Sequence, residues 1–245
     1  MKRIVVENVW KKFSIGYTGR QRALSKFISM FSGREPKKEF WAVKGVSMTA
    51  EAGEILGLIG ENGSGKSTLL RLIAGIYAKD KGKIETDGRI ISLINLNIGL
   101  KDRLTMRDNI YMCCSLFGLG KRMVDERFNA IVEFTELEEY VNTKLYQFSA
   151  GMAQRLAFSI AVHCNPEILL LDEVFEIGDE SFKKKSTERI EGLVGEGATV
   201  VLVSHDLPLI ERHCSRVAWM DRGVVVREGN STRIVEEYGR HEKKG

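Results

Sequence analysis

The chain lacks the features that mark membrane-spanning, secreted and disulfide-bonded proteins. No apolar run reaches the roughly 18 residues needed to cross a bilayer. The first ten residues, MKRIVVENVW, have charges but no long apolar core and no small-residue cleavage site, so we expect no signal peptide. The four cysteines have no metal-ligand spacing and predict reduced thiols in a cytosolic protein.

The composition fits an ordered globular protein. Of the 245 residues, 43% are hydrophobic and 29% are charged, which is enough apolar material for a sizeable core. Only three prolines and no low-complexity segment are present, so we expect disorder only in a charged tail at residues 241–245. The net charge of +4 would suit an anionic membrane surface or an acidic partner, or have no meaning, and alone it does not indicate nucleic-acid binding.

Residues 60–68 read GENGSGKST and fit the phosphate-binding pattern G-x-x-x-x-G-K-[ST]. An apolar run enters this loop and a helix-like run leaves it. Glycines let backbone N–H groups approach phosphate oxygens, and the positive dipole end of the following helix favours an anion. The alternative is a chance glycine-rich turn, which the flanking strand and helix signals disfavour. The candidate nucleotide-binding residues are Gly60, Glu61, Asn62, Gly63, Ser64, Gly65, Lys66, Ser67 and Thr68.

Four side chains in two motifs have specific chemistry. Lys66 can reach the β- and γ-phosphates as a catalytic cation, and the Ser67 hydroxyl can ligate Mg²⁺. A second motif, ILLLDE, ends an apolar strand with two acids. Asp172 can hold the Mg²⁺ shell at the carboxyl edge of a sheet, and Glu173 can accept the proton of an attacking water. Without the phosphate loop, a buried strand with a solvated acidic end would explain the second motif about as well.

Hydrophobic patterning places a helical block inside an α/β core. Between about residues 105 and 163 the pattern is mostly helical. Continuous apolar runs that follow it are typical of central parallel strands. The predicted strands are residues 4–9, 42–50, 168–171 and 199–203, with further strands in residues 84–94 around a turn at 86–88 and a late hairpin at residues 217–226 around a turn at 221–223.

A longer connection than a hairpin needs separates the first two predicted strands, at about residues 14–40. In it Leu24, Phe27, Ile28 and Phe31 have helical spacing and form one apolar face. One interpretation is a surface helix packed on its own domain. The other is a docking element for a membrane partner or for the membrane surface.

Residues 148–155 read FSAGMAQR, and with this motif the chain resembles the ATP-binding-cassette (ABC) family. The family signature is LSGGQ followed by a QR pair, which Ser149, Gly151, Gln154 and Arg155 match. The resemblance implies that Ser149 and Gly151 contact the γ-phosphate of ATP bound to the opposite subunit of a homodimer. Without the other motifs, Ser149, Ala150 and Gly151 would predict only a helix cap.

The resemblance covers about residues 4–229 and assigns two further residues. His205 follows a buried strand, where the family has a catalytic histidine that contacts the γ-phosphate and orients the water; a lone histidine there is usually a loop residue. Asp179 matches the aspartate of the loop that crosses the dimer interface. The implied fold is α/β, with a P-loop NTPase (RecA-like) core, an N-terminal antiparallel β subdomain and an inserted α-helical subdomain. We expect one nucleotide-binding domain over residues 1–240.

Three departures from the family pattern leave assignments open. The signature reads SAGM rather than SGGQ. The usual glutamine before the helical block is absent, and Asn95 or Asn97 could replace it. Phe13 is the candidate for the aromatic ring that stacks on adenine, with Tyr17 and Trp10 as rivals.

Four features together resemble one subgroup: the insertion between the first two strands, the glutamine-free loop ending near Gly99, the S-x-G-M signature followed by RLAFSIA (residues 149–161), and the pattern DE-V-x-x-x-GD-x-x-F (residues 172–182). This subgroup comprises the cassettes that export lipid-linked polysaccharides across the bacterial inner membrane: O-antigen, capsule or teichoic acid. The resemblance implies an ATPase that uses ATP and Mg²⁺ and forms a homodimer. It also implies an integral-membrane permease as partner, no nucleic acid, and a peripheral position on the cytoplasmic side of the inner membrane. About sixteen residues follow Gly229, so we expect no additional C-terminal sugar-binding domain.

Other functions fit less well. An importer or a drug or lipid exporter of the same family is the nearest alternative. A soluble cassette ATPase of DNA repair or of the ribosome is disfavoured, because the chain has no sustained heptads and holds one cassette. A small-molecule kinase would share the phosphate loop but not the signature or His205.

Overall fold

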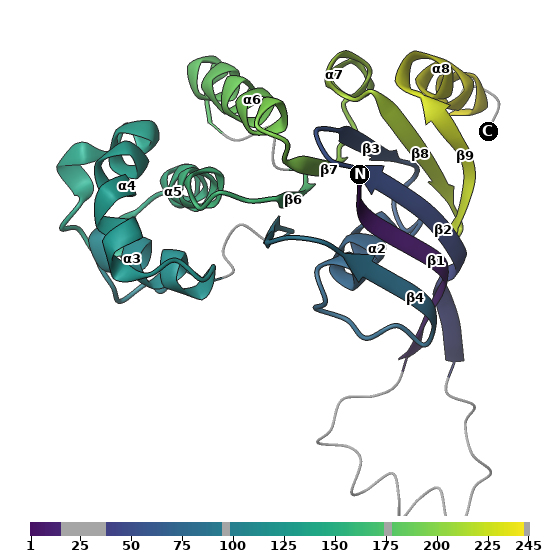
Figure 1. The fold of residues 1–245 in the computed structure, drawn as a ribbon, viewed down its shortest axis with the longest axis horizontal. Helices are drawn as coiled ribbons and strands as arrows, with labels where there is room; N and C mark the ends of the chain where they lie inside the picture. The colour runs from purple at the N-terminus through teal and green to yellow at the C-terminus, as the bar shows by residue number, and fades with distance from the viewer. Residues whose placement is uncertain (16–37, 95–98, 174–177, 243–245) are drawn as a thin grey trace, which may run out of the picture.

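Two sheets form the centre of the computed structural model, which describes residues 1–15, 38–94, 99–173 and 178–242 (Figure 1). The smaller sheet is antiparallel, with strand order β2-β1-β4. The larger has the order β5-β6-β7-β3-β8-β9 and is parallel except for β9. The strands are β1 (Lys2–Ile15), β2 (Lys38–Glu51), β3 (Ile55–Ile59), β4 (Lys81–Thr86), β5 (Ile90–Leu93), β6 (Ile168–Asp172), β7 (Thr199–Val203), β8 (Arg216–Asp221) and β9 (Val224–Asn230).

The central strands are buried on both faces because alternate side chains point into two separate cores. In β3, Leu56 and Leu58 pack in the core that contains α2 (Lys66–Ile73) and the smaller sheet. Ile55 and Ile59 pack in the other core, with the remaining helices. Strands β6, β7 and β3 are neighbours in the parallel sheet, so their carboxyl ends lie at one edge. The segments that follow these ends contain most of the predicted site.

The helices lie in two groups (Figure 1). Three form a lobe beyond the β5–β6 edge, which we call the helical lobe: α3 (Met106–Leu116), α4 (Lys121–Thr135) and α5 (Ala150–His163). Three more cover one face of the larger sheet: α6 (Glu180–Gly195), α7 (Leu207–His213) and α8 (Ser231–Glu242). The lobe is inserted between β5 and β6, which confirms the predicted helical block inside an α/β core.

Two predicted boundaries differ from the structure. Strands β1 and β2 pair as far as Ile15 and Lys38, so both ends of the expected insertion at residues 14–40 are strand residues. Pairing between β1 and β2 satisfies the backbone N–H and C=O groups at these ends. The local sequence pattern did not indicate this pairing. Helix α8 extends through Glu242, so the first two residues of the expected tail are helical. The apolar face at residues 24–31 lies outside the described residues.

Neither a membrane-spanning helix nor a disulfide is found in the described part of the chain. No helix there is long and apolar enough to cross a bilayer. All four cysteines are buried as free thiols. Burial raises the pKa of Cys113 to about 11 and that of Cys214 to about 12. These two thiols are therefore protonated and unreactive at neutral pH.

Candidate functional site

The loop at residues 60–68 connects β3 to α2, and its glycines have conformations that other residues rarely adopt. The backbone φ is +141° at Gly60 and +108° at Gly65. A Cβ added to Gly60 would lie 2.0 Å from the carbonyl oxygen of Met220, and one added to Gly65 would lie 2.5 Å from that of Ala42. The loop is therefore wedged between β8 and β2, and glycine is required at both positions.

Gly60→Ala is expected to lower the free energy of unfolding by about 2–3 kcal/mol, since the methyl group adds backbone strain and a clash with β8. Gly63→Ala is the matched control: φ there is +81°, but no atom lies within 4 Å of the added Cβ. We expect it to cost about 1 kcal/mol. Urea unfolding of the two variants measures both values. Equal losses would contradict the wedged loop.

Lys66 begins α2, yet its side chain turns back over the loop. Its Nζ donates hydrogen bonds to the carbonyl oxygens of Gly60, at 2.6 Å, and Glu61, at 2.9 Å. Burial lowers the pKa of Lys66, and the charges of Asp172 and Glu173 act in the opposite direction. The structure thus holds an amine within the loop, where phosphate oxygens can replace the two carbonyl groups as its partners.

The Ser64 hydroxyl provides an independent sign that the loop fits an anionic ligand. Ser64 is only 3% exposed. Its Oγ finds no hydrogen-bond partner in the part of the chain that the structure describes. Buried polar atoms without a partner are rare and need an explanation such as an absent ligand. Together with the glycine backbone and Lys66, this donor fits a phosphate group.

The acid that ends β6 is hydrogen-bonded to the phosphate loop. Asp172 accepts a hydrogen bond from the Ser67 hydroxyl. Burial raises the pKa of Asp172; the Ser67 hydrogen bond opposes this shift, and the charge of Glu173 adds to it. A hydroxyl beside a carboxylate offers the oxygen ligands that Mg²⁺ prefers. Ser67 and Asp172 therefore fit the predicted metal site.

Glu173 follows β6 in a strained backbone conformation and lies against His205. Its φ is +58°, in the left-handed region, and its N–H donates to the carbonyl oxygen of Val203 at 2.9 Å. The Nε2 atom of His205 lies 3.1 Å from Oε1 of Glu173. Both side chains are open to solvent, with 60% of Glu173 and 44% of His205 exposed. Strained non-glycine residues of this kind cluster at functional sites.

The signature residues belong to the start of α5 on the helical lobe, which lies apart from α2, the helix that follows the phosphate loop (Figure 1). Ser149 caps α5, with its Oγ accepting a hydrogen bond from the N–H of Met152 at 3.2 Å. A Cβ at Gly151 would meet only the Ser149 hydroxyl, at 3.9 Å. Among the described residues, no hydrogen bond joins Ser149 or Gly151 to the loop at residues 60–68. One chain therefore presents two separated halves of the predicted site.

The candidate adenine-stacking ring lies in an aromatic cluster at the end of β1. The Phe13 ring is 5.4 Å from that of Tyr77 and 5.9 Å from that of Phe40. Its rival Trp10 packs edge-on against Trp41 at 5.3 Å. Tyr17, Asn95 and Asn97 lie outside the described residues. Phe13 remains the prediction; its ring is only half-buried, and its neighbour Phe40 is 46% exposed.

The motifs and their geometry agree with a comparison to protein families. The model of the ABC transporter family matches residues 43–176. The chain belongs to the ABC transporter family. It therefore has an ABC ATPase domain, an ATP-binding cassette.

Several curated cassettes are similar to this one over most of its length. The teichoic acids export ATP-binding protein TagH of Enterococcus faecalis is 39% identical over 228 residues, which are 93% of this chain and 50% of that protein. The O-antigen export system ATP-binding protein RfbB of Myxococcus xanthus is 35% identical, over 97% of this chain and 56% of that protein. An RfbB of Klebsiella pneumoniae is 38% identical over 82% of each chain. The cassette thus spans about half the length of the first two relatives.

Solved ATP-binding cassettes share the fold. The ATP-binding subunit of an ABC transporter has a TM-score of 0.76 at 22% identity, over 96% of this chain and 93% of that one. The cassette MJ0796, in a dimeric post-hydrolysis state bound to ADP and Pi, also has a TM-score of 0.76, at 23% identity, over 93% of this chain and 98% of that one. At these identities the likeness establishes the fold alone.

The predicted hairpin turn at residues 221–223 also supports the phosphate loop, which the sequence did not indicate. Gly223 has φ +89°, and its N–H donates to the carbonyl oxygen of Ser64 at 2.9 Å. Its own carbonyl oxygen accepts from the N–H of Lys44 at 2.8 Å. The sequence predicts the turn itself, but its hydrogen-bond partners Ser64 and Lys44 lie far away in the sequence.

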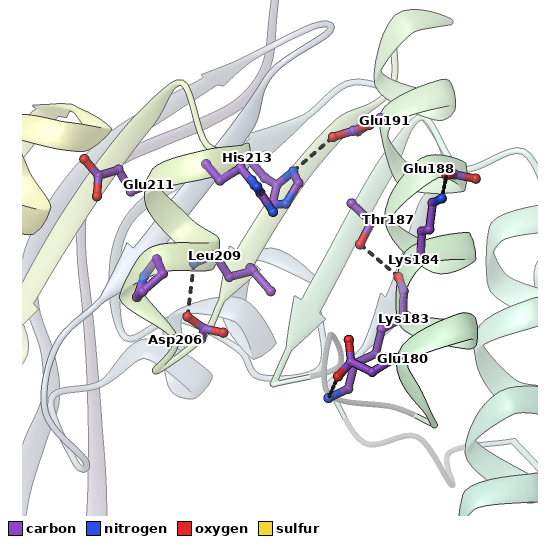
Figure 2. A pocket seen from close by; sticks show the side chains of 12 residues that line it. Glu180, Lys183, Lys184, Thr187, Glu188, Glu191, Asp206, Leu209, Glu211 and His213 are labelled. Carbon is purple, nitrogen blue, oxygen red and sulfur yellow. Dashed lines mark hydrogen bonds and ion pairs between the residues drawn. The ribbon is translucent and has the colours of Figure 1, made fainter.

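A charged cleft of about 1020 Å³ lies between α6 and α7 of the cassette (Figure 2). Its side chains have both signs of charge, and several pair with one another. For example, Nδ1 of His213 lies 3.0 Å from Oε1 of Glu191. The cleft is next to two segments singled out in the sequence, because Glu180 follows Asp179 and Asp206 follows His205. It contains none of the predicted nucleotide or metal residues, so we assign it no part in ATP binding.

Proposed function

We propose that this chain is the ATP-hydrolysing subunit of an ABC transporter that exports a lipid-linked polysaccharide across the bacterial inner membrane. The observation that supports it most strongly is the 39% identity to a teichoic acids export cassette over 93% of this chain. Relatives named for O-antigen export, at 35% and 38% identity, point to the same class of cargo. The cargo would be O-antigen, capsule or teichoic acid.

The phosphate loop would bind ATP, and Lys66 would neutralise the β- and γ-phosphates. The Ser64 hydroxyl would gain the partner that it lacks within the chain. Ser67 and Asp172 would hold Mg²⁺, which supplies charge neutralisation at the phosphates when it is bound. The Ser67–Asp172 hydrogen bond supports this role, because both oxygens already lie together. Phe13 would stack on the adenine ring.

Glu173 would act as general base. Its carboxylate takes a proton from a water molecule whose oxygen attacks the γ-phosphorus, while the bond from that phosphorus to the β–γ bridging oxygen breaks. His205, in contact with the same carboxylate, would orient the γ-phosphate and the water. The exposed position of both side chains suits a water nucleophile.

A second copy of the chain would complete each site. Ser149 is exposed and Gly151 half-buried at the start of α5, and no hydrogen bond among the described residues joins either to the phosphate loop, so they are available to the ATP of a partner. Two chains would then enclose two ATP molecules. Closure of this homodimer would drive a separate integral-membrane permease, with the cassettes held peripherally on the cytoplasmic side.

Affinity purification from detergent-solubilised native membranes tests the proposal, with proteins identified by mass spectrometry and the soluble fraction of the same cells as control. We expect a multi-helix permease in the membrane fraction only, together with enzymes of polysaccharide synthesis. Recovery with ribosomal or DNA-repair proteins in both fractions would contradict the transport function and leave the ATP site intact.

A further inference from the structure

Arg155 connects three parts of the fold through one guanidinium group. Its Nη2 donates to Oδ2 of Asp179 at 2.8 Å, and its Nη1 donates to Oε2 of Glu136 at 3.2 Å. The guanidinium carbon lies 4.8 Å from the centre of the Phe182 ring. Only 16% of the Arg155 side chain is exposed. An arginine can make these contacts at the same time because its planar group has several fixed donors and also stacks on aromatic rings.

The backbone of Gly178, just before Asp179, lies directly against this guanidinium. Gly178 has φ +79°, and a Cβ added there would lie 3.2 Å from Nε of Arg155 and 3.0 Å from Cβ of Phe182. Asp179 also caps α6, because its Oδ1 accepts a hydrogen bond from the N–H of Phe182 at 3.0 Å. One carboxylate oxygen thus fixes the start of α6, and the other fixes that start to Arg155.

Glu136, the second carboxylate partner of Arg155, lies at the end of α4 in the helical lobe. Glu136 ends α4 in a left-handed conformation with φ +58°. Its second carboxylate oxygen lies 3.2 Å from Nζ of Lys185 on α6. That Nζ is also 4.8 Å from the centre of the Phe134 ring of α4. The Arg155–Asp179 and Glu136–Lys185 pairs therefore tie the lobe to α6 at two points, and the Glu136–Arg155 pair joins α4 to α5 within the lobe.

Arg155 and the signature residues belong to the same helix. Ser149 caps α5, and Arg155 lies six residues later, about 9 Å along the axis. The hydrogen bond between Arg155 and Asp179 therefore also fixes the start of α5 relative to the start of α6. The proposed function directs the start of α5 toward a second copy of the chain, and the family resemblance implies the same for Asp179 at the start of α6.

We propose that Arg155 is a positioning residue that holds the Gly178–Asp179 segment against the helical lobe, so that this segment and Ser149 meet a second copy as one rigid unit. This inference rests on the proposed function. The ordinary alternative is an ion pair that stabilises only the single chain. If Arg155 is a positioning residue, removing the contact weakens the closed dimer. If the ion pair only stabilises the single chain, removing it lowers the stability of the fold.

The test uses the full chain with Glu173→Gln, in which slow hydrolysis should preserve an ATP-bound dimer. Sedimentation measures the dimer dissociation constant in MgATP. Arg155→Gln should weaken the dimer by about tenfold or more, because a charge-assisted contact is lost. The dimer dissociation constant of Arg155→Lys should fall between those of the parent and of Arg155→Gln, since an ammonium group keeps the charge but lacks the fork that reaches both carboxylates. The ATP affinity of the monomer should stay within about twofold, because the contacts of Arg155 in the described structure go to Glu136, Asp179 and Phe182 and not to the phosphate loop.

Asp179→Asn gives the second arm, because asparagine keeps the α6 cap and removes only the charge. It should weaken the dimer as Arg155→Gln does, and the double variant should be no worse than either single change. Arg122→Gln is the matched control: it removes the 3.1 Å ion pair to Glu126 on the same lobe, where the arginine side chain is 93% exposed. It should leave the dimer unchanged.

Each outcome separates the accounts. Dimers of unchanged affinity in the Arg155 and Asp179 variants would overturn this inference alone. A weakened dimer that merely follows a lower unfolding temperature or a lost monomer affinity for ATP would also overturn it, in favour of the stabilising ion pair. If the Glu173→Gln parent itself formed no dimer in MgATP, both the proposed function and this inference would be contradicted.

Discussion

Glu173→Gln is expected to lower the turnover number for ATP hydrolysis by about 10²–10⁴-fold. Glutamine keeps the size of the side chain but cannot take a proton from water. The geometry supports this role: the carboxylate is 60% exposed, lies 3.1 Å from His205, and is held by a strained backbone at the end of a buried strand. ATP binding should persist, since Lys66 and the phosphate loop are unchanged.

Phosphate release under saturating MgATP measures the effect of Glu173→Gln. Glu188→Gln is the matched control, because Glu188 lies on α6 with 64% of its side chain exposed and pairs with the exposed Lys184 at 3.9 Å. The control should keep turnover within about twofold of the parent, as expected for a surface ion pair. Turnover of Glu173→Gln at the level of this control would remove Glu173 from the role of base.

Lys66→Met is expected to weaken ATP binding by about 10²–10⁴-fold, since removal of one partner of a buried charge pair costs about 3–5 kcal/mol. Lys66 is 6% exposed and reaches two carbonyl oxygens of its own loop. Methionine fills a similar volume and should preserve the packing around α2.

Isothermal titration with ATP measures the affinity of Lys66→Met, and the unfolding temperature shows whether the fold persists. Lys79→Met is the control, because Lys79 is an exposed residue after α2. Its affinity should equal that of the parent. A folded Lys66→Met protein that binds ATP as the parent does would contradict the assignment of the phosphate site.

The parts of the site that follow a local pattern could be predicted from the sequence. The phosphate loop is nine consecutive residues between a strand and a helix, and Asp172 and Glu173 end a fully apolar strand. The phosphate loop needs glycines for its positive φ angles, and a strand buried on both faces needs apolar residues. The order of strands β6, β7 and β3 then brings their ends together at one sheet edge.

The contacts between distant segments could not be predicted in this way. The wedge of Gly60 against Met220 joins residues that are 160 positions apart, and no periodicity in either segment records it. Arg155 was visible only as part of a motif, whereas its contacts with Glu136 and Asp179 depend on how the helical lobe docks on the core. Side-chain networks of this kind depend on tertiary packing rather than on local sequence.

The central claim is that hydrolysis by this chain drives export of a lipid-linked polysaccharide, and the sidedness of that polysaccharide tests it most directly. In source cells that lack the chain, the amount at the cell surface and the amount bound to carrier lipid inside can be measured. The account predicts internal accumulation and surface loss, restored by the parent chain but not by Glu173→Gln. Normal surface polysaccharide in cells without the chain, or full restoration by Glu173→Gln, would contradict it.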